Sequence, residues 1–218
     1  MLVVEDLICE YPEGEGRTVR GLTLPSFRLQ DGEAWGVEGP SGSGKTTLFH
    51  CLAGLLSPTR GRIAIDGVEL TGLTEPERAQ WRGTNLGYVF QEPKLLPFLT
   101  VAENIRLSAQ LAGKEASARR IRDFLAEVDL PDCGDRFPRQ LSGGERQRVA
   151  FIRAIVREPR LLLADEPTAS LDVRNSRRIL DLLLAYQARS GCMLLCASHD
   201  PAVQERFARK LELRKEEA

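Results

Sequence analysis

The chain has 218 residues, with 30 Lys+Arg against 31 Asp+Glu, so its formal net charge is −1. This length favours one large domain, and the balanced charge argues against a dedicated nucleic-acid-binding protein, so we expect no nucleic acid partner. No apolar run approaches the roughly 18 residues that a membrane-spanning helix needs, and no signal peptide is readable at Met1–Asp6. We therefore expect a cytoplasmic protein. Its five cysteines lack CxxC spacing and are expected to be reduced thiols in the core.

Short alternating segments in the first part of the chain predict an antiparallel sheet. Strands are expected over Leu2–Tyr11, Val19–Leu24 and Phe27–Leu29, between turns that contain glycine and proline. A hairpin is expected over Arg62–Glu69, because its alternating residues are interrupted by an Asp-Gly pair, which is typical of tight turns.

The middle of the chain has a helical pattern. Thr100 and Glu103 form a capping box that predicts a helix to about Ala112, and a second helix is expected over about Ala116–Val128. The segment Pro131–Pro138 is expected to be a loop. The sequence therefore predicts a helical insertion between about Glu92 and Arg139.

From Leu141 onwards, helices alternate with strands that are apolar on both faces, which is typical of a parallel sheet covered on both sides. After a first helix we expect a strand over Leu161–Ala164, a helix over Asp172–Ala188, a strand over Cys192–Ala197 and a helix over Pro201–Ala208. The overall prediction is an α/β fold with a parallel-sheet core.

The most informative motif is the segment Gly39–Thr46, which matches GxxxxGK[ST] at every fixed position. It follows an apolar strand over Ala34–Val37 and precedes a helix over Lys45–Leu55, which is the context of a phosphate-binding P-loop. Backbone N–H groups of such a loop bind phosphate, assisted by the positive end of the helix. The candidate phosphate-binding residues are Gly39, Pro40, Ser41, Gly42, Ser43, Gly44, Lys45, Thr46 and Thr47.

Two carboxylates follow the buried strand Leu161–Ala164. Asp165 and Glu166 stand where parallel sheets place their ligand sites. We expect Asp165 and the Thr46 hydroxyl to hold Mg²⁺, and Glu166 to polarise the attacking water.

A second helix start, at Leu141–Glu145, carries a serine and two glycines and predicts another anion site. One chain would then carry two phosphate sites about a hundred residues apart. Either both face one nucleotide in a monomer, or the second site serves the nucleotide of a partner chain. The second arrangement is self-complementary and closes as a two-fold, head-to-tail dimer.

In this order, the P-loop, Leu141–Glu145 and Asp165-Glu166 resemble the ATP-binding subunits of ABC transporters, over essentially the whole chain. The resemblance implies an ATPase with ATP and Mg²⁺ as cofactors and a P-loop NTPase (RecA-like) fold. It implies one domain over 1–218, with a catalytic core and antiparallel β subdomain in 1–91 and 140–218 and a helical subdomain in 92–139. It further implies a homodimer, or a pair with a second ATPase subunit, bound to membrane permease subunits on the cytoplasmic face of the inner membrane.

The same resemblance assigns roles to single residues. Lys45, Gln91, Glu166 and His199 are expected to be catalytic. Gln91 matches the Q-loop that contacts Mg²⁺ or water, His199 the histidine that contacts the γ-phosphate, and Tyr11 the aromatic residue that stacks on adenine. The expected contribution of the opposite subunit comprises Ser142, Gly143, Gly144, Glu145 and Asp172. Glu145 is a departure, because many family members have glutamine there.

Finer features favour one group within the family. The segments Leu86–Gln91, Leu163–Thr168 and Tyr11–Gly14 look like those of the macrolide-export, lipoprotein-release and cell-division group. An amino-acid importer subunit and a non-transport ABC ATPase remain alternatives, and the transported substrate is not readable. The arginines between Arg136 and Arg160 are expected to form mostly a solvated, ion-paired face, and the pairing of the last strand stays open.

Overall fold

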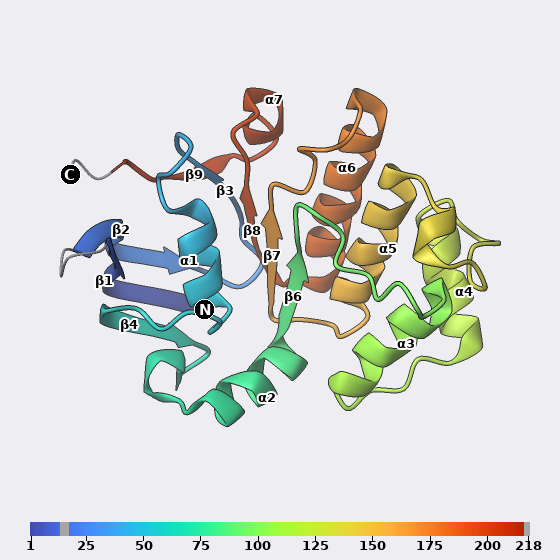
Figure 1. Cartoon of the computed structure of the whole chain (residues 1–218), viewed down its shortest axis with the longest axis horizontal. Helices are drawn as coiled ribbons and strands as arrows, with labels where there is room; N and C mark the ends of the chain where they lie inside the picture. The colour runs from blue at the N-terminus through green and yellow to red at the C-terminus, as the bar shows by residue number, and fades with distance from the viewer. Residues whose placement is uncertain (14–17, 216–218) are drawn as a thin grey trace.

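The computed structural model describes residues 1–13 and 18–215, so Gly14 of the predicted subgroup motif lies outside the described residues. Figure 1 shows an antiparallel sheet at one end of the molecule, a parallel sheet in the middle and helices at the other end. The predicted α/β architecture is confirmed.

The antiparallel sheet has the strand order β2-β1-β4-β5. Its strands are β1 (Leu2–Pro12), β2 (Thr18–Leu29), β4 (Arg60–Ile65) and β5 (Val68–Glu69). The predicted hairpin is confirmed, with Asp66 and Gly67 at φ 51° and 81° in its turn. The prediction of two strands between Val19 and Leu29 is wrong, because β2 continues through Pro25. β2 is an edge strand, where every second N–H group faces away from β1, so a proline is tolerated there.

The parallel sheet has the order β6-β7-β8-β3-β9. Its strands are β3 (Ala34–Glu38), β6 (Leu86–Val89), β7 (Leu161–Asp165), β8 (Met193–Ala197) and β9 (Arg209–Glu212). β9 pairs with β3 in parallel orientation, which establishes the pairing of the last strand. Because all these strands are parallel, their carboxyl ends meet at one edge of the sheet.

Helices cover both faces of this sheet. Leu161 and Leu163 of β7 belong to the apolar cluster that includes α1 (Lys45–Leu52) and the antiparallel sheet. Leu162 and Ala164 belong to the opposite cluster, with α5 (Gly143–Ile155) and α6 (Val173–Ser190). In Figure 1, α1 accordingly lies on one side of β6–β8, and α5 and α6 lie on the other.

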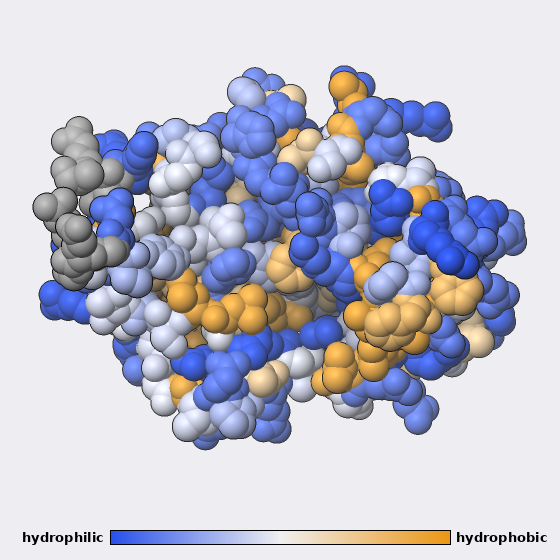
Figure 2. All heavy atoms as spheres, in the orientation of Figure 1, coloured by the Kyte–Doolittle hydropathy of each residue, from blue (hydrophilic) through white to orange (hydrophobic). Residues whose placement is uncertain are grey.

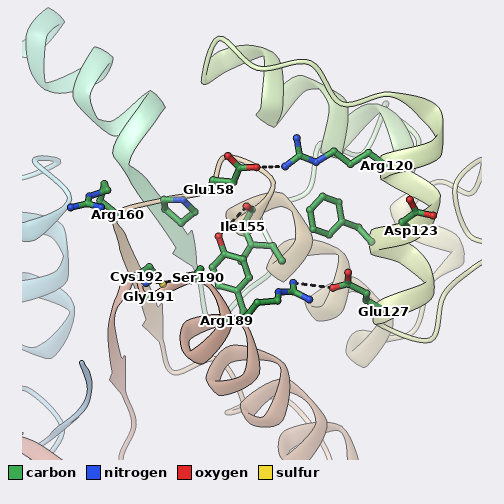
Figure 3. A pocket seen from close by; sticks show the side chains of 13 residues that line it. Arg120, Asp123, Glu127, Ile155, Glu158, Arg160, Arg189, Ser190, Gly191 and Cys192 are labelled. Atoms are coloured by element: carbon green, nitrogen blue, oxygen red, sulfur yellow. Dashed lines mark hydrogen bonds and ion pairs between the residues drawn. The ribbon is translucent and has the colours of Figure 1, made fainter. Parts of the chain in front are cut away.

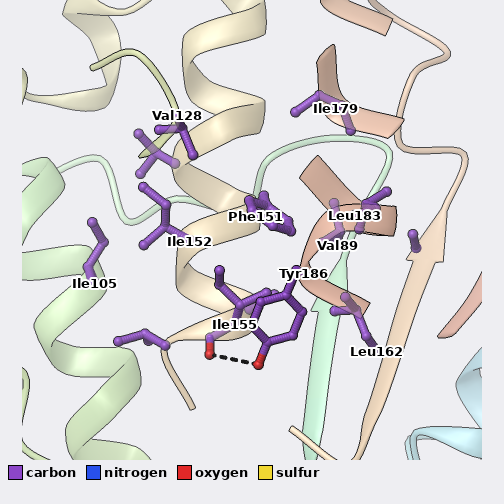
Figure 4. Packing of buried hydrophobic residues seen from close by; sticks show 14 of the residues in the cluster. Val89, Ile105, Val128, Phe151, Ile152, Ile155, Leu162, Ile179, Leu183 and Tyr186 are labelled. Carbon is purple, nitrogen blue, oxygen red and sulfur yellow. Dashed lines mark hydrogen bonds between the residues drawn. The ribbon is translucent and has the colours of Figure 1, made fainter. Parts of the chain in front are cut away.

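The second cluster extends into the middle of the chain. Figure 4 shows α5 side chains such as Phe151 and Ile152 between the sheet and Ile105 of α3 (Val101–Leu111). Buried residues of α4 (Ala118–Glu127) join the same cluster. The predicted start of α3 is confirmed, because the Thr100 side chain accepts from the Glu103 N–H at 3.3 Å and Glu103 binds back to the Thr100 N–H.

Several element boundaries differ from the predictions. α1 ends at Leu52, before Gly54 in the left-handed region (φ 63°). α7 (Pro201–Gln204) is short because the chain must turn into β9, and the Gln204 side chain is tied to the Val37 and Ser198 carbonyls. The helix α2 (Glu75–Asn85) and the 3₁₀ turns η1 (Leu70–Gly72) and η2 (Pro138–Gln140) were not predicted.

Within the described ranges, none of the helices has the length and apolarity required to cross a bilayer. All five cysteines are free thiols and buried, as predicted.

Candidate functional site

A cavity of about 430 Å³ lies at the carboxyl edge of the parallel sheet. The segments that follow β3, β6, β7 and β8 all contribute to its wall, so the topology brings together residues far apart in the sequence. The lining residues are Gly21, Ser41, Gly42, Ser43, Gly44, Lys45, Thr46, Thr47, Gln91, Glu166 and His199. Most of the predicted P-loop therefore meets Gln91, Glu166 and His199 in one place.

The start of α1 is open towards this cavity. Gly44 caps the helix with φ 89° and without a side-chain hydrogen bond, and the first turn holds no acidic residue. A Cβ at Gly44 would lie 2.6 Å from the Gly21 carbonyl oxygen, so both the conformation and the space require glycine. The first N–H groups of α1 have no acceptor inside the helix, and with the helix dipole they favour an anion.

Lys45 is held against the loop that precedes it. Its ammonium donates hydrogen bonds to the carbonyl oxygens of Gly39 at 2.7 Å and Pro40 at 3.2 Å. The side chain is 9% exposed, and within the described residues it makes no ion pair. Its charge is therefore available to an anion that enters the cavity.

Asp165 lies at the end of β7 with its carboxylate buried. The Tyr88 hydroxyl donates to Oδ2 at 3.2 Å, whereas Oδ1 has no hydrogen-bond partner among the described residues. Burial is the main cause that raises the pKa of Asp165, and the charge of Glu166 adds to it. The nearby hydroxyls of Thr46 and Tyr88 oppose this increase, although Thr46 makes no hydrogen bond of normal geometry with Asp165. Asp165 Oδ1 is therefore a buried acceptor beside the P-loop without a hydrogen-bond partner among the described residues.

Glu166 follows Asp165 in an unusual backbone conformation. Its φ of 45° is in the left-handed region, which costs a non-glycine residue on the order of 1–3 kcal/mol. The Glu166 N–H donates to the Ala197 carbonyl at 2.9 Å, which ties this residue to the end of β8.

His199 contacts the Glu166 carboxylate directly. Its Nδ1 lies 3.0 Å from Glu166 Oε1, and its backbone N–H donates to Oε2 at 3.4 Å. The Glu166 side chain is 13% exposed and that of His199 is 68% exposed. The pair therefore places a sheltered carboxylate beneath an accessible imidazole.

Tyr11 borders the cavity. Its hydroxyl lies 3.1 Å from Thr47 Oγ1, and its ring covers Gly21, where a Cβ would lie 2.5 Å from the ring. Tyr11 is 40% exposed.

The second predicted anion site lies elsewhere. Ser142 caps α5, where its Oγ accepts from the Glu145 N–H at 3.2 Å and the Glu145 carboxylate accepts from the Ser142 N–H at 2.7 Å. These hydrogen bonds lower the pKa of Glu145. The amides of Gly143 and Gly144 remain as first-turn donors without an acceptor inside the helix.

Asp172 is connected to this second site through Asn175. It caps α6 by accepting from the Asn175 N–H at 2.8 Å, and the Asn175 side chain also accepts from Arg148 at 2.9 Å. Gly144 packs against Asn175 so closely that a Cβ would lie 2.5 Å from its Oδ1. Asp172, Asn175 and Arg148 line a cavity of about 870 Å³ that contains none of the P-loop residues. The P-loop cavity in turn is lined by neither Ser142–Glu145 nor Asp172, so one chain keeps the two predicted anion sites apart.

Sequence reasoning missed two contacts at the first site. Tyr88 pairs with Leu163 in the sheet, and the side chains of Leu163 and Asp165 point to the same face. The strand register alone could therefore have placed Tyr88 near the Asp165 carboxylate. The buried amide of Gln147 donates to the Phe90 carbonyl at 2.9 Å, immediately before Gln91. No sequence signal indicated this second contact.

The expectation of a solvated, ion-paired arginine face is wrong for Arg153 and Arg157. Both line a groove of about 330 Å³ whose apolar wall includes Tyr88, Phe90 and Leu107. Burial lowers the pKa of both, to about 10 for Arg153, where the charge of Arg157 contributes. Neither has a carboxylate within 4.0 Å among the described residues. Figure 2 shows apolar surface on both sides of this hollow.

A further cavity of about 510 Å³, shown in Figure 3, contains no predicted site residue. Its apolar wall includes Phe124, and two ion pairs lie at its rim, Arg120 with Glu158 and Arg189 with Glu127. Asp123 also lines it and has no ion pair among the described residues.

Comparison with known proteins agrees with this arrangement. A family model described as ABC transporter matches residues 22–169. The chain is 39% identical over 217 residues to the lipoprotein-releasing system ATP-binding protein LolD 1 of Rhodopirellula baltica, covering 98% of this chain and 93% of that protein.

Solved structures with the same fold include a dimeric post-hydrolysis state of the ATP-binding cassette MJ0796 bound to ADP and Pi. It superposes with a TM-score of 0.90 at 32% identity, covering 99% of this chain and 95% of that one. A dimeric structure of MJ0796 described as a bacterial ABC transporter cassette gives the same values. The predicted family and fold are confirmed, and the chain belongs to the ABC transporter family as one of its ATP-binding, ATP-hydrolysing subunits.

Proposed function

We propose that this chain binds Mg·ATP in the cavity at the carboxyl edge of the parallel sheet and hydrolyses it there to drive a separate membrane permease. The observation that carries the proposal is the meeting of the P-loop, Gln91, Glu166 and His199 in one cavity. We assign phosphate binding to Lys45, Thr47 and the amides of Gly39–Thr46, and adenine stacking to Tyr11. Stacking of a base on an aromatic ring is worth roughly 1–3 kcal/mol.

The donor set fits a magnesium ion. The orphaned Oδ1 of Asp165, the Thr46 hydroxyl and Gln91 are oxygen donors beside the P-loop, as Mg²⁺ requires. No group of three or more His, Cys, Asp or Glu side chains in the described ranges could hold a metal, which suits an ion completed by phosphate oxygens and water. Its chemical contribution there would be to neutralise charge on the phosphates.

Glu166 is the residue we assign to the attacking water. Its sheltered carboxylate would orient that water and accept its proton, while His199 holds the carboxylate in place and presents its ring to the γ-phosphate. Such pre-positioned groups are the main catalytic resource in phosphoryl transfer.

A second copy would complete each site. Because the chain keeps its two anion sites apart, we infer a head-to-tail dimer in which Ser142–Glu145 and Asp172 of one copy cover the nucleotide of the other. Both MJ0796 structures are dimers. A pair with a second ATPase subunit would use the same surfaces.

The permease is proposed to be of the lipoprotein-release type, because the relative at 39% identity is named as part of a lipoprotein-releasing system. We place its contact in the groove lined by Arg153 and Arg157, where two half-buried cations without carboxylate partners among the described residues fit an acidic, apolar segment. We also propose that the chain lies on the cytoplasmic face of the membrane. We also propose that residues 92–139 act as a helical subdomain within one domain spanning 1–218.

The variant Glu166→Gln tests the proposed chemistry. Loss of a general base typically lowers the rate about 10²–10⁴-fold, while ATP binding should persist and trap the dimer. Phosphate release measures the rate, and light scattering after size exclusion measures the dimer. The control Glu115→Gln alters an exposed loop carboxylate and should behave as wild type. Normal turnover by Glu166→Gln would remove this residue from its role.

A mixing experiment tests the shared site. Lys45→Ala and Ser142→Arg chains should each be inactive alone, but a mixed dimer with sites built across the interface contains one intact site. Partial recovery of ATPase activity on mixing is therefore expected. Sites complete within one chain would give no recovery.

The permease contact has its own variant. Arg157→Gln should leave basal ATPase activity unchanged but weaken stimulation by the co-expressed permease in phospholipid vesicles. The exposed Arg174→Gln on α6 serves as the matched control. Equal stimulation of the Arg157→Gln and Arg174→Gln proteins would contradict the proposed docking groove.

A further inference from the structure

Tyr88 lies between the groove and the buried carboxylate of Asp165. Its hydroxyl donates to Asp165 Oδ2 at 3.2 Å, and no other described hydrogen bond reaches that carboxylate. Its ring is stacked on Phe90, with centroids 4.0 Å apart and planes at 14°, and meets the ring of Phe49 edge-on. Both the position and the orientation of this hydroxyl are therefore fixed by packing.

The contact leaves the two oxygens of Asp165 in different states. Oδ2 is occupied by Tyr88, whereas Oδ1 is buried and has no partner among the described residues. Without the hydroxyl, the carboxylate could rotate and present either oxygen. A group that hydrogen-bonds a metal ligand fixes its orientation and increases its affinity for the metal.

Tyr88 is suited to remain a donor. Its phenol has one O–H group to donate, whereas an ionised carboxylate can only accept, so the direction of this hydrogen bond is fixed. The β6–β7 register, which pairs Tyr88 with Leu163, sets the hydroxyl beside the residue two positions further along β7.

We propose that Tyr88 is a positioning residue for the divalent cation, holding Asp165 so that Oδ1 faces the Thr46 side of the P-loop. This inference rests on the proposed Mg·ATP site and adds a residue that does not itself touch the metal or the nucleotide.

The test uses Mn²⁺ as a paramagnetic probe, titrated into the full-length protein with ATP in the Glu166→Gln background and followed by electron paramagnetic resonance. Tyr88→Phe removes only the hydroxyl and should weaken Mn²⁺ binding by about 10-fold or more, as for other residues that orient metal ligands. Affinity for ATP in EDTA should stay unchanged. When Glu166 is intact, Tyr88→Phe should raise the Mg²⁺ concentration that gives half-maximal ATPase activity. At saturating Mg²⁺ its kcat should return to the wild-type value.

Two variants separate positioning from packing. Tyr186→Phe removes another tyrosine hydroxyl, which lies 3.5 Å from the Ile155 carbonyl oxygen and outside the P-loop cavity. This variant should leave Mn²⁺ affinity unchanged. Phe90→Leu removes the stacking partner but keeps the Tyr88 hydroxyl, and should lose less affinity than Tyr88→Phe. Tyr88→Met provides a second chain without the hydroxyl if the phenylalanine variant does not fold.

Wild-type Mn²⁺ affinity in folded Tyr88→Phe or Tyr88→Met would overturn the inference while leaving the proposed site intact. Failure of the Glu166→Gln parent protein to bind Mn²⁺ with ATP would instead overturn the proposed site itself. The two failures are therefore distinguishable in one titration series.

Discussion

At the scale of single residues, Asp165 carries an electrostatic cost in the folded chain. Its pKa is raised from the ordinary 3.8, mainly by burial. As the pH rises above 3.8, the unfolded chain loses this proton before the folded chain does, so stability falls until the folded pKa is passed. At neutral pH the buried charge therefore lowers the free energy of unfolding.

Asp165→Asn should remove this cost. In EDTA and without nucleotide, we expect a higher free energy of unfolding than wild type at pH 7, and a difference that shrinks as the pH falls towards 4. Urea denaturation across this range measures both. Asp135→Asn, an exposed loop carboxylate, is the matched control. A less stable Asp165→Asn protein at pH 7 would show that the carboxylate is favourable even without the cation.

The residues at the site differ in how far sequence could predict them. Lys45, Gln91, Glu166 and His199 follow strands of one parallel sheet, and parallel strands bring their carboxyl ends to the same edge. The contact of His199 with Glu166 depends on the left-handed φ of Glu166, which no local pattern encodes. The burial of Arg153 and Arg157 depends on packing between segments far apart in the chain, so their helical spacing alone was misleading.

At the scale of elements, the start of α5 has two roles that a substitution can separate. Ser142 caps the helix within the chain, and we propose that it also faces the nucleotide of a partner chain. Aspartate caps helices about as well as serine, but its charge would repel phosphate.

Ser142→Asp is therefore expected to change the free energy of unfolding by less than about 0.5 kcal/mol, whereas Ser142→Ala should lose about 0.5–2 kcal/mol. In the Glu166→Gln background, Ser142→Asp should abolish the ATP-dependent dimer. Urea denaturation and light scattering measure the two effects. Thr100→Asp at the cap of α3 is the control and should retain the dimer; a Ser142→Asp protein that still dimerises with ATP would contradict the second role.

Element prediction succeeded where a local signal agreed with the tertiary structure. α3 was predicted from its capping box, which the structure forms. α2 also has a capping box, formed by Thr74 and Glu77. Its residues are mostly exposed, so the sequence shows no helical repeat of apolar residues that would predict this helix. β2 was divided at Pro25 because a sequence does not reveal which strand will lie at a sheet edge.

At the scale of the whole molecule, both apolar clusters share one sheet. Neighbouring residues of β7 belong to different clusters, Leu162 to that of α5 and α6 and Leu163 to that of α1. Loss of either cluster would expose the same strands, so neither half of the molecule is expected to unfold alone.

Leu162→Ala and Leu163→Ala should each lower the free energy of unfolding by about 2–5 kcal/mol, the usual range for a buried leucine. Each variant should still unfold in a single transition, recorded by circular dichroism and by tryptophan fluorescence. Val173→Ala, at an exposed position on α6, is the control for substitution by alanine. Two separated transitions in either variant would show that the clusters are independent.

The alternation along β7 also sets where the chain can change in length. One residue inserted or deleted within Leu161–Asp165 would turn every later side chain of the strand to the opposite face of the sheet. Asp165 would then point into the cluster of α5 and α6, away from Tyr88 and the start of α1. The loop at 113–117 has no side chains that alternate between two faces of a sheet, so natural and engineered variation in length is expected there. β7, in contrast, should keep its five residues.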